Sequence, residues 1–228
     1  ADIRLQAFRA PTDNDKSFGN WLAKDWKRQG LDTAQVVVTD GGRRQEIRLP
    51  EGTITMTAEQ QDDEYELTFT CQGTLPELPR LGIVMALPDD YNRVEWYGLG
   101  PWDNYPDRQA ACTIGKWTST VAEQYTPYAR PQDSGSHGSC AYVVLRNGAG
   151  KTIRVEAIGE PFAFSALPYS ARELATKNHH YELRPDGHTY LSIDCAVLGL
   201  GNSSCGPGVL KRYAIDKSTT HRLRFRIR

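Results

Sequence analysis

The chain has 228 residues, of which 39% are hydrophobic and 24% are charged, and its formal net charge at pH 7 is −1. This composition is typical of a globular protein with a sizeable core, and the length allows one large all-β domain or two small ones. The net charge argues against nucleic acid or an anionic membrane as a partner, because either would require a clustered basic surface. No apolar run approaches the ~20 residues of a membrane-spanning helix.

The first part of the chain predicts a polar turn followed by a short helix. In the turn, Arg9 to Asp15, a proline ends one element and Asx residues begin the next. The helix is expected over Asn20 to Gln29, with Trp21 and Trp26 on its apolar side. Two tryptophans on so short a helix are expected to pin it to a sheet.

Residues 34–87 predict a meander of antiparallel strands. Short β-branched runs are separated by turns rich in glycine and proline. From Tyr65 to Cys71, and again from Leu81 to Leu87, apolar residues occupy alternate positions. That period is typical of a strand with one face on a core.

The stretch Trp96 to Arg108 (WYGLGPWDNYPDR) predicts an ordered aromatic loop at the end of a strand, Arg93 to Tyr97. Its glycine and proline residues interrupt any helical or strand period. We expect packing to pin Trp102 and Tyr105, and hydrogen bonds to fix the charged side chains. The residues themselves favour a structural corner over a ligand site.

A second irregular stretch, Tyr125 to Gly135, combines tyrosines, prolines and an arginine. Its Arg130 is expected to form bidentate ion pairs, either with Asp133 or with Asp103 and Asp107 of the first loop. Such pairs would tie the two loops together.

The remaining elements are short. Strands are predicted at Lys116 to Tyr125, Cys140 to Leu145 and Thr152 to Ile158, and a final strand ends the chain. Ser170 to Lys177 begins like a capping box and predicts a second helix. The whole pattern predicts an all-β fold of antiparallel strands with one or two short helices.

Five segments, in order, resemble the C-terminal domain of β-galactosidases of glycoside hydrolase family two. They are RAPTDND, the aromatic loop, YTPYARPQDSG, the segment from Phe164 to Leu183, and GLGNSSCGPGVL from Gly199 to Leu210. The resemblance implies a β-supersandwich similar to that of galactose mutarotases, with residues 1–228 as one domain of a larger enzyme. It assigns a structural motif to Arg9, Asp13, Asn14, Asp15, Trp96, Gly98, Gly100, Pro101, Asn104, Tyr105, Pro106, Asp107, Arg108 and Arg130.

The resemblance also implies that this domain is not catalytic by itself. A retaining glycosidase needs two carboxyl groups about 5 Å apart, and in the family these come from a (β/α)₈ barrel, which takes ~250 residues. We therefore expect no catalytic residue and no cofactor in this chain, with magnesium and sodium bound by other domains of the parent enzyme. The implied partners are those domains and a galactoside or oligosaccharide substrate, and the parent is expected to be a homo-oligomer.

The loop from Gly199 to Leu210 is where the domain is expected to border the substrate. Relatives carry a tryptophan that stacks on the sugar where this chain has Cys205. A thiol cannot supply the flat apolar surface of an indole, so another aglycone or another stacking partner is expected. The residues assigned to the aglycone side are Cys205, Ser204, Ser203, Asn202 and Phe18.

Two other functions remain open at this point. A free-standing carbohydrate-binding module would have an aromatic-lined groove, whereas an excised domain would leave an apolar patch bare. An aldose-epimerase-like enzyme would need a paired histidine and glutamate, and the sequence implies no such pair. No HxxxH or HxH spacing occurs among the five histidines, so no metal site is expected.

Overall fold

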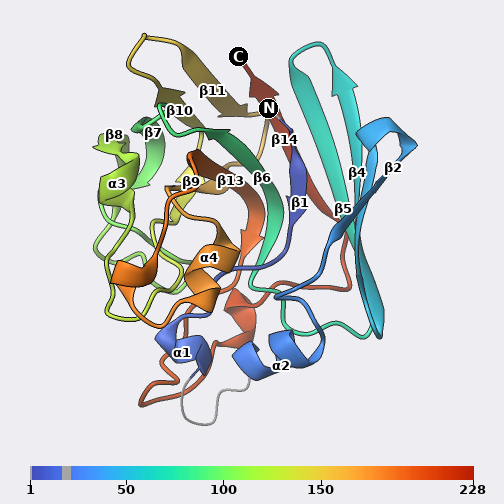
Figure 1. The fold of residues 1–228 in the computed structure, drawn as a ribbon. Coiled ribbons are helices and arrows are strands. Elements are labelled where there is room, and N and C mark those ends of the chain that lie inside the picture. The colour runs from blue at the N-terminus through green and yellow to red at the C-terminus, as the bar shows by residue number, and fades with distance from the viewer. Residues whose placement is uncertain (1, 17–21) are drawn as a thin grey trace.

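The computed structural model describes residues 2–16 and 22–228, and these form two antiparallel β-sheets (Figure 1). The smaller sheet lies in the middle of the view, and the larger sheet continues on both sides of it. The smaller sheet has five strands in the order β1 (Arg4–Gln6), β6 (Arg80–Pro88), β13 (His188–Val197), β12 (Phe162–Leu167) and β9 (His137–Cys140). The predicted all-β antiparallel fold is therefore confirmed.

The larger sheet has nine strands. Their order is β2 (Val36–Thr39), β3 (Arg44–Leu49), β4 (Gly52–Gln61), β5 (Glu64–Gly73), β14 (His221–Ile227), β11 (Thr152–Ala157), β10 (Tyr142–Arg146), β7 (Arg93–Gly100) and β8 (Thr113–Thr120). The first four strands follow the predicted meander, but its last predicted strand, β6, lies in the smaller sheet, and β14 joins β5 to β11 instead. The last strand of the chain therefore lies inside the larger sheet, between β5 and β11.

Four short helices and three single 3₁₀ turns complete the described elements. The helices are α1 (Asp13–Lys16), α2 (Leu22–Arg28), α3 (Val121–Gln124) and α4 (Ala171–Thr176), and the turns are Asp40–Gly42, His180–Glu182 and Lys211–Tyr213. Helices α1, α2 and α4 lie at one end of the sheets, among the long loops (Figure 1). None of the described helices is long and apolar enough to cross a membrane.

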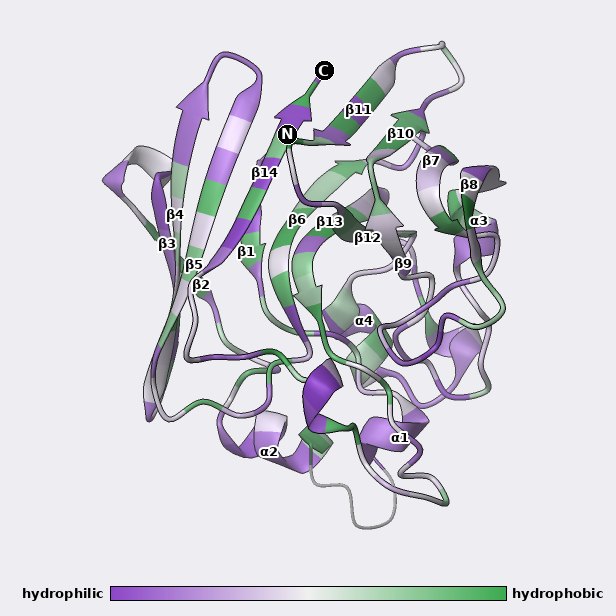
Figure 2. Cartoon of the chain, turned by 180° about the vertical axis from the view of Figure 1, so that it is seen from behind, coloured by the Kyte–Doolittle hydropathy of each residue, from purple (hydrophilic) through white to green (hydrophobic). Residues whose placement is uncertain are grey.

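One hydrophobic cluster contains side chains from both sheets. Leu67 and Phe69 from the larger sheet and Ile83 and Met85 from the smaller sheet are fully buried in it, at the positions that the alternation predicts. In Figure 2, β6 and β13 are largely hydrophobic, whereas α1 and α2 are largely hydrophilic. The period of two in these strands therefore identifies the core face correctly.

Helix α2 agrees with the predicted helix over the residues that the structure describes. Trp26 is completely buried, and its Nε1 donates a hydrogen bond to the Glu77 carbonyl at 2.7 Å. Its ring meets that of Phe8 edge-on, with 6.4 Å between the centroids. Trp26 thus pins the helix as expected, while Trp21 lies outside the described residues.

Two predicted strands have wrong limits. The strand predicted from Cys140 to Leu145 begins at Tyr142, because Cys140 ends β9 of the smaller sheet. Lys116 to Tyr125 was expected to be a single strand, but β8 ends at Thr120 and α3 follows directly. The Thr120 hydroxyl accepts a hydrogen bond from the Glu123 N–H at 3.2 Å, and the Glu123 carboxylate accepts one from the Thr120 N–H at 2.8 Å. This capping box starts a helical turn in a sequence whose side chains alternate like those of a strand.

The second predicted helix, α4, has a simpler start than expected. The Ser170 hydroxyl accepts a hydrogen bond from the Glu173 N–H at 3.1 Å. The Glu173 carboxylate does not complete a capping box, because it accepts a hydrogen bond from the Arg184 N–H at 3.0 Å. Ser170 alone therefore caps this helix.

His137 on β9 is buried between aromatic rings. Its ring centroid lies 4.3 Å from that of Trp96 and 5.2 Å from that of Phe164. Its Nε2 lies 2.6 Å from Oε1 of Gln124. Burial disfavours the charged imidazolium and lowers the pKa of His137 to about 4.

Because His137 is buried in its neutral form, we expect the free energy of unfolding to decrease at acidic pH. An unfolded histidine has a pKa of about 6.5, so between pH 6.5 and about 4 the unfolded chain takes up a proton that the folded chain refuses. Stability is therefore lost as the pH falls through this window, by about 2.5 kcal/mol at pH 4.5. Urea unfolding at pH 7.5 and at pH 4.5 should show a larger loss for the wild type than for His137→Gln. Equal losses in the two proteins would contradict the prediction.

Candidate functional site

Four loops that are distant in the sequence meet at one end of the two sheets. They are residues 9–16, 101–112, 125–136 and 198–210, and they contain most of the motif residues singled out in the sequence. The aromatic loop begins at the end of β7, where Trp96 is buried and its Nε1 donates a hydrogen bond to the Leu99 carbonyl at 3.1 Å. The strand thus fixes the point at which the loop leaves the sheet.

Two glycines of this motif lie where a side chain has no room. A Cβ on Gly98 would lie 2.4 Å from the Cys140 sulfur, and one on Gly100 would lie 2.6 Å from the Trp117 ring. Pro101, which follows, is exposed, and Pro106 is half-buried. The glycines therefore serve the close approach of neighbouring strands and rings.

Arg9 and Asp15 form a buried ion pair beneath the loops. Arg9 Nη2 lies 3.0 Å from one oxygen of Asp15, and Arg9 Nε lies 3.2 Å from the other. Arg9 Nη1 also donates a hydrogen bond to the Leu198 carbonyl at 2.8 Å. Burial by itself lowers the pKa of Arg9, but the carboxylates of Asp15 and Asp133 outweigh it and hold that pKa above its usual value.

Asp107 and Arg108 fix the course of the loop that contains Cys205. The Asp107 carboxylate accepts hydrogen bonds from the N–H groups of Leu200 at 2.9 Å and Gly201 at 2.7 Å. Arg108 Nη2 donates to the Gly201 carbonyl at 2.5 Å and to Oδ1 of Asn202 at 2.6 Å. The aromatic loop thus holds the start of the Cys205 loop by its backbone.

Asn14 holds the same loop from the other side. Its Oδ1 accepts hydrogen bonds from the Ser204 N–H at 3.0 Å and the Ser204 hydroxyl at 2.7 Å. Its Nδ2 donates to the Gly201 carbonyl at 2.8 Å. Ser203 is buried beneath this contact, whereas Asn202, Ser204 and Cys205 are exposed. The loop therefore presents Cys205 on a fixed backbone, while Phe18 lies outside the described residues.

The two irregular stretches are joined by hydrogen bonds. Tyr105 donates from its hydroxyl to the Asp133 carboxylate at 2.6 Å, and the Gly135 N–H donates to Asp103 at 3.3 Å. The side chain of Asn104 accepts from the Gly138 N–H at 2.8 Å. Tyr105 and Asn104 are buried, as a structural corner requires.

Two sequence expectations about these loops are wrong. Trp102 is not pinned by packing, because its side chain is 68% exposed. Arg130 is also exposed, and within residues 2–16 and 22–228 it forms no ion pair. The ion pair of Asp133 is formed with Arg80 instead, at 3.9 Å. Arg80 lies outside the motifs singled out in the sequence, so nothing in the sequence predicts that it lies beside Asp133.

The loops line a pocket of about 580 Å³. Asp13, Asn14, Arg108 and Ser204 line it, with Tyr128 as its partly exposed ring. Gln132 also lines it and forms two hydrogen bonds with Asp13, from the Asp13 N–H at 2.9 Å and to its carboxylate at 3.1 Å. The pocket thus offers hydroxyl, amide, guanidinium and carboxylate groups to a polar ligand. Nothing in the sequence distinguished Gln132 from its neighbours.

No metal is assigned to this pocket. Among the residues that the structure describes, no group of three or more histidine, cysteine, aspartate and glutamate side chains is arranged to hold one. The carboxylate and amide oxygens at the pocket instead accept hydrogen bonds from backbone N–H groups and from the Gln132 amide. Their chemistry is that of hydrogen bonding.

Comparison with known proteins identifies the family. A family model described as β-galactosidase small chain matches residues 1–227. The chain belongs to this family. Its resemblance to the C-terminal domain of β-galactosidases is therefore confirmed.

The relatives are much longer than this chain. It is 29% identical to a β-galactosidase from Actinobacillus pleuropneumoniae, across 95% of this chain and 22% of that protein. It is 30% identical to a β-galactosidase from Staphylococcus xylosus, across 92% of this chain and 22% of that protein. The chain thus spans about a fifth of the length of these curated relatives.

The search of solved structures found a galactose mutarotase-like protein from Lactobacillus casei. The likeness has a TM-score of 0.39 and 8% sequence identity, and it covers 85% of this chain and 72% of that protein. We draw nothing about function from a likeness of this size.

Proposed function

We propose that residues 1–228 form a single non-catalytic domain of a β-galactosidase, which completes the aglycone side of the active site. The parent enzyme would hydrolyse terminal β-D-galactosides with retention, using two carboxylates of another domain. The observation that carries the proposal is the convergence of the family motifs on one pocket. There Asn14, Asp107 and Arg108 hold the Cys205 loop by its backbone.

The exposed apolar side chains at this end support docking against the rest of the enzyme. Trp102 is 68% exposed, Leu210 is 52% exposed, and Tyr128 is 41% exposed, and all three belong to the loops around the pocket. Large apolar side chains left exposed are typical of an interaction surface when they form a patch. The proposed partners are the remaining domains of the parent enzyme, which would also bind magnesium and sodium, and the parent would be a homo-oligomer.

Turnover of nitrophenyl β-galactoside tests the non-catalytic role. The 228-residue chain alone should show none, because neither catalytic carboxylate is proposed to lie in it. A parent enzyme truncated before this chain should regain activity when the chain is added. Turnover by the isolated chain, purified free of host galactosidase, would overturn the proposal.

The Cys205 position tests the place of the loop. In the full-length parent, Cys205→Trp should change KM for disaccharides more than KM for aryl galactosides, because an indole adds a flat apolar surface on the aglycone side. Ala149→Trp, on an exposed turn of the larger sheet, is the matched control and should change neither. If Cys205→Trp left both KM values unchanged, the loop would not line the site.

A further inference from the structure

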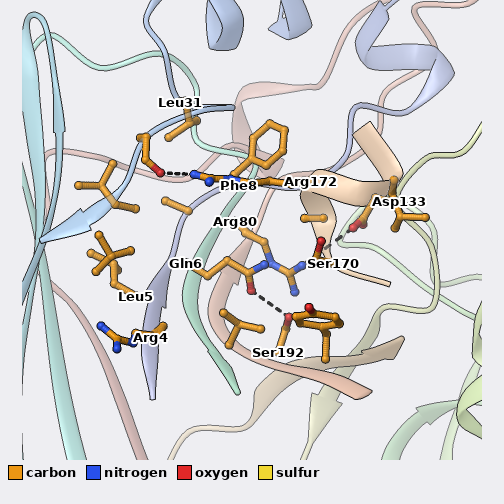
Figure 3. Close-up of a pocket in the computed structure, with 18 of the residues that line it drawn as sticks. Arg4, Leu5, Gln6, Phe8, Leu31, Arg80, Asp133, Ser170, Arg172 and Ser192 are labelled. Atoms are coloured by element: carbon orange, nitrogen blue, oxygen red, sulfur yellow. Dashed lines mark hydrogen bonds and ion pairs between the residues drawn. The ribbon is translucent and has the colours of Figure 1, made fainter. Parts of the chain in front are cut away.

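A second cavity lies against the smaller sheet, away from the Cys205 loop. It has a volume of about 360 Å³, in the range of small-molecule sites. Strands β1, β6, β12 and β13 supply its floor, and α4 supplies one wall. Figure 3 shows Arg80, Gln6 and Ser192 together in the middle of this cavity, with Phe8 and Leu5 around them. Asp133 lines both this cavity and the loop pocket.

The guanidinium of Arg80 has one side engaged and one side available. Its Nε and Nη2 bind the two carboxylate oxygens of Asp194 at 3.1 and 2.5 Å, and Nη2 also donates to the Ser165 hydroxyl at 3.3 Å. Its Nη1 lies 3.9 Å from Asp133, which is too far for a hydrogen bond. Arg80 is only 6% exposed, and no hydrogen bond from Nη1 to another residue of the described chain is present. Because Arg80 lines the cavity, an acceptor on a ligand bound there could take a hydrogen bond from Nη1.

The floor of the cavity also carries a pair of polar side chains. Ser192 on β13 donates a hydrogen bond to Oε1 of Gln6 on β1 at 2.9 Å (Figure 3). The Ser192 oxygen can still accept, and the Gln6 oxygen can still accept from a second donor. Together with Asp133, these groups offer both donors and acceptors to a ligand.

The charges of the cavity disfavour an anion. The positive charge of Arg80 is balanced by Asp194 and is also close to Asp133, so the deep part of the cavity has no excess positive charge. At the mouth, Arg4 is paired with Asp2 at 2.6 Å, and Arg172 donates to the Ala34 carbonyl. In the deep part of the cavity, a carboxylate or phosphate would therefore meet the Asp133 charge, because Arg80 is already balanced by Asp194 and the charge of Arg172 stays at the mouth.

A neutral ligand with hydroxyl groups can accept a hydrogen bond from Nη1 of Arg80 and brings no negative charge close to Asp133. A hydroxyl group donates one hydrogen bond and accepts others, so a single hydroxyl between Arg80 and Asp133 can accept from Nη1 and donate to the carboxylate. The apolar part of the lining, which includes Leu5, Phe8 and Leu167, suits the C–H face of a sugar ring. Ser165 and Ser192 lie on the same floor for further hydroxyls.

We propose that this cavity binds a neutral, polyhydroxylated ligand of monosaccharide size, held between Arg80, Asp133 and the Gln6–Ser192 pair. Asp133 is shared with the pocket between the loops, but Arg80, Gln6 and Ser192 line this cavity alone, so the proposal does not depend on the proposed function. The site gives the domain a carbohydrate contact of its own.

Titration of the full 228-residue chain with D-galactose, D-glucose and sorbitol, followed by ligand-observed NMR and calorimetry, tests the proposal. At least one of the three should bind saturably, and D-galacturonate should bind more weakly than D-galactose. Ala171→Phe, which fills the cavity from α4, should weaken binding about tenfold or more. Ala149→Phe, on an exposed turn, is the matched control and should bind like the wild type.

Gln6→Leu keeps the test decisive if Ala171→Phe fails to fold. It removes the amide while keeping a similar volume, so it should weaken binding severalfold while the far-ultraviolet circular dichroism spectrum stays unchanged. The proposal is overturned if none of the three neutral probes binds, if binding is unchanged in every one of the two variants that folds, or if galacturonate binds more tightly than galactose. These measurements do not use the activity of the parent enzyme, so their result does not depend on whether the proposed function is correct.

Discussion

Asp15→Asn is expected to lower the free energy of unfolding by about 3 to 5 kcal/mol. Asp15 is completely buried and Arg9 is 1% exposed, so the substitution leaves a positive charge inside the protein without its partner. Asp15 also accepts hydrogen bonds from the Thr12 N–H and hydroxyl, both at 2.9 Å. Asparagine keeps only one acceptor oxygen, so its NH2 group must face the donors of either Arg9 or Thr12. Urea unfolding at pH 7.5 measures the loss.

Two controls separate burial from charge in this prediction. Asp25→Asn breaks the ion pair with Arg28, whose side chains are 41% and 73% exposed, and should change stability by less than about 0.5 kcal/mol. Replacing both buried charges, with Arg9→Met and Asp15→Leu, should cost less than Asp15→Asn alone, because no unpaired charge remains. A double variant as unstable as the single variant would show that shape, and not charge, dominates at this site.

The fold follows from local patterns that the sequence displays. Alternation from Tyr65 to Cys71 and from Leu81 to Leu87 identifies β5, β6 and their core faces, because side chains of a strand point to opposite sides. The end of β8 was misjudged because a local hydrogen-bond exchange at Thr120 competes with the strand pattern. Local chemistry thus decides the limits of the elements, while periodicity decides their kind.

The candidate site was only partly predictable. The family motifs indicated which loops matter, but the contacts between them join residues far apart in the chain, such as Asn14 with Ser204 and Asp107 with Leu200. No periodicity encodes such pairs. Arg130 was expected to reach Asp133, whereas Tyr105 and Arg80 are the groups that lie beside it. Charge complementarity suggests several partners for one carboxylate, and only the packing selects among them.

Trp102 and Tyr105 show the same difficulty within one loop. Both are aromatic residues of the motif, and no feature of the sequence distinguishes a buried ring from an exposed one here. Tyr105 is 4% exposed, with its hydroxyl on Asp133 and the Arg9 guanidinium 5.8 Å from its ring centroid. Trp102 is 68% exposed, and its backbone carbonyl, not its ring, is what Asn104 contacts at 3.2 Å.

Tyr105→Ala is therefore expected to lower the free energy of unfolding by about 3 to 5 kcal/mol, whereas Trp102→Ala should change it by less than about 0.5 kcal/mol. Loss of the tyrosine ring leaves a cavity between the two irregular stretches. It also removes the hydroxyl that donates a hydrogen bond to the buried carboxylate of Asp133. Tyr105→Phe keeps the ring and should cost about 1 to 3 kcal/mol, which is the part due to the hydroxyl. Thermal and urea unfolding of the three variants measure the differences. Equal losses for the alanine variants at positions 102 and 105 would mean that the indole is packed in solution, which contradicts its exposure and its place on the proposed docking surface.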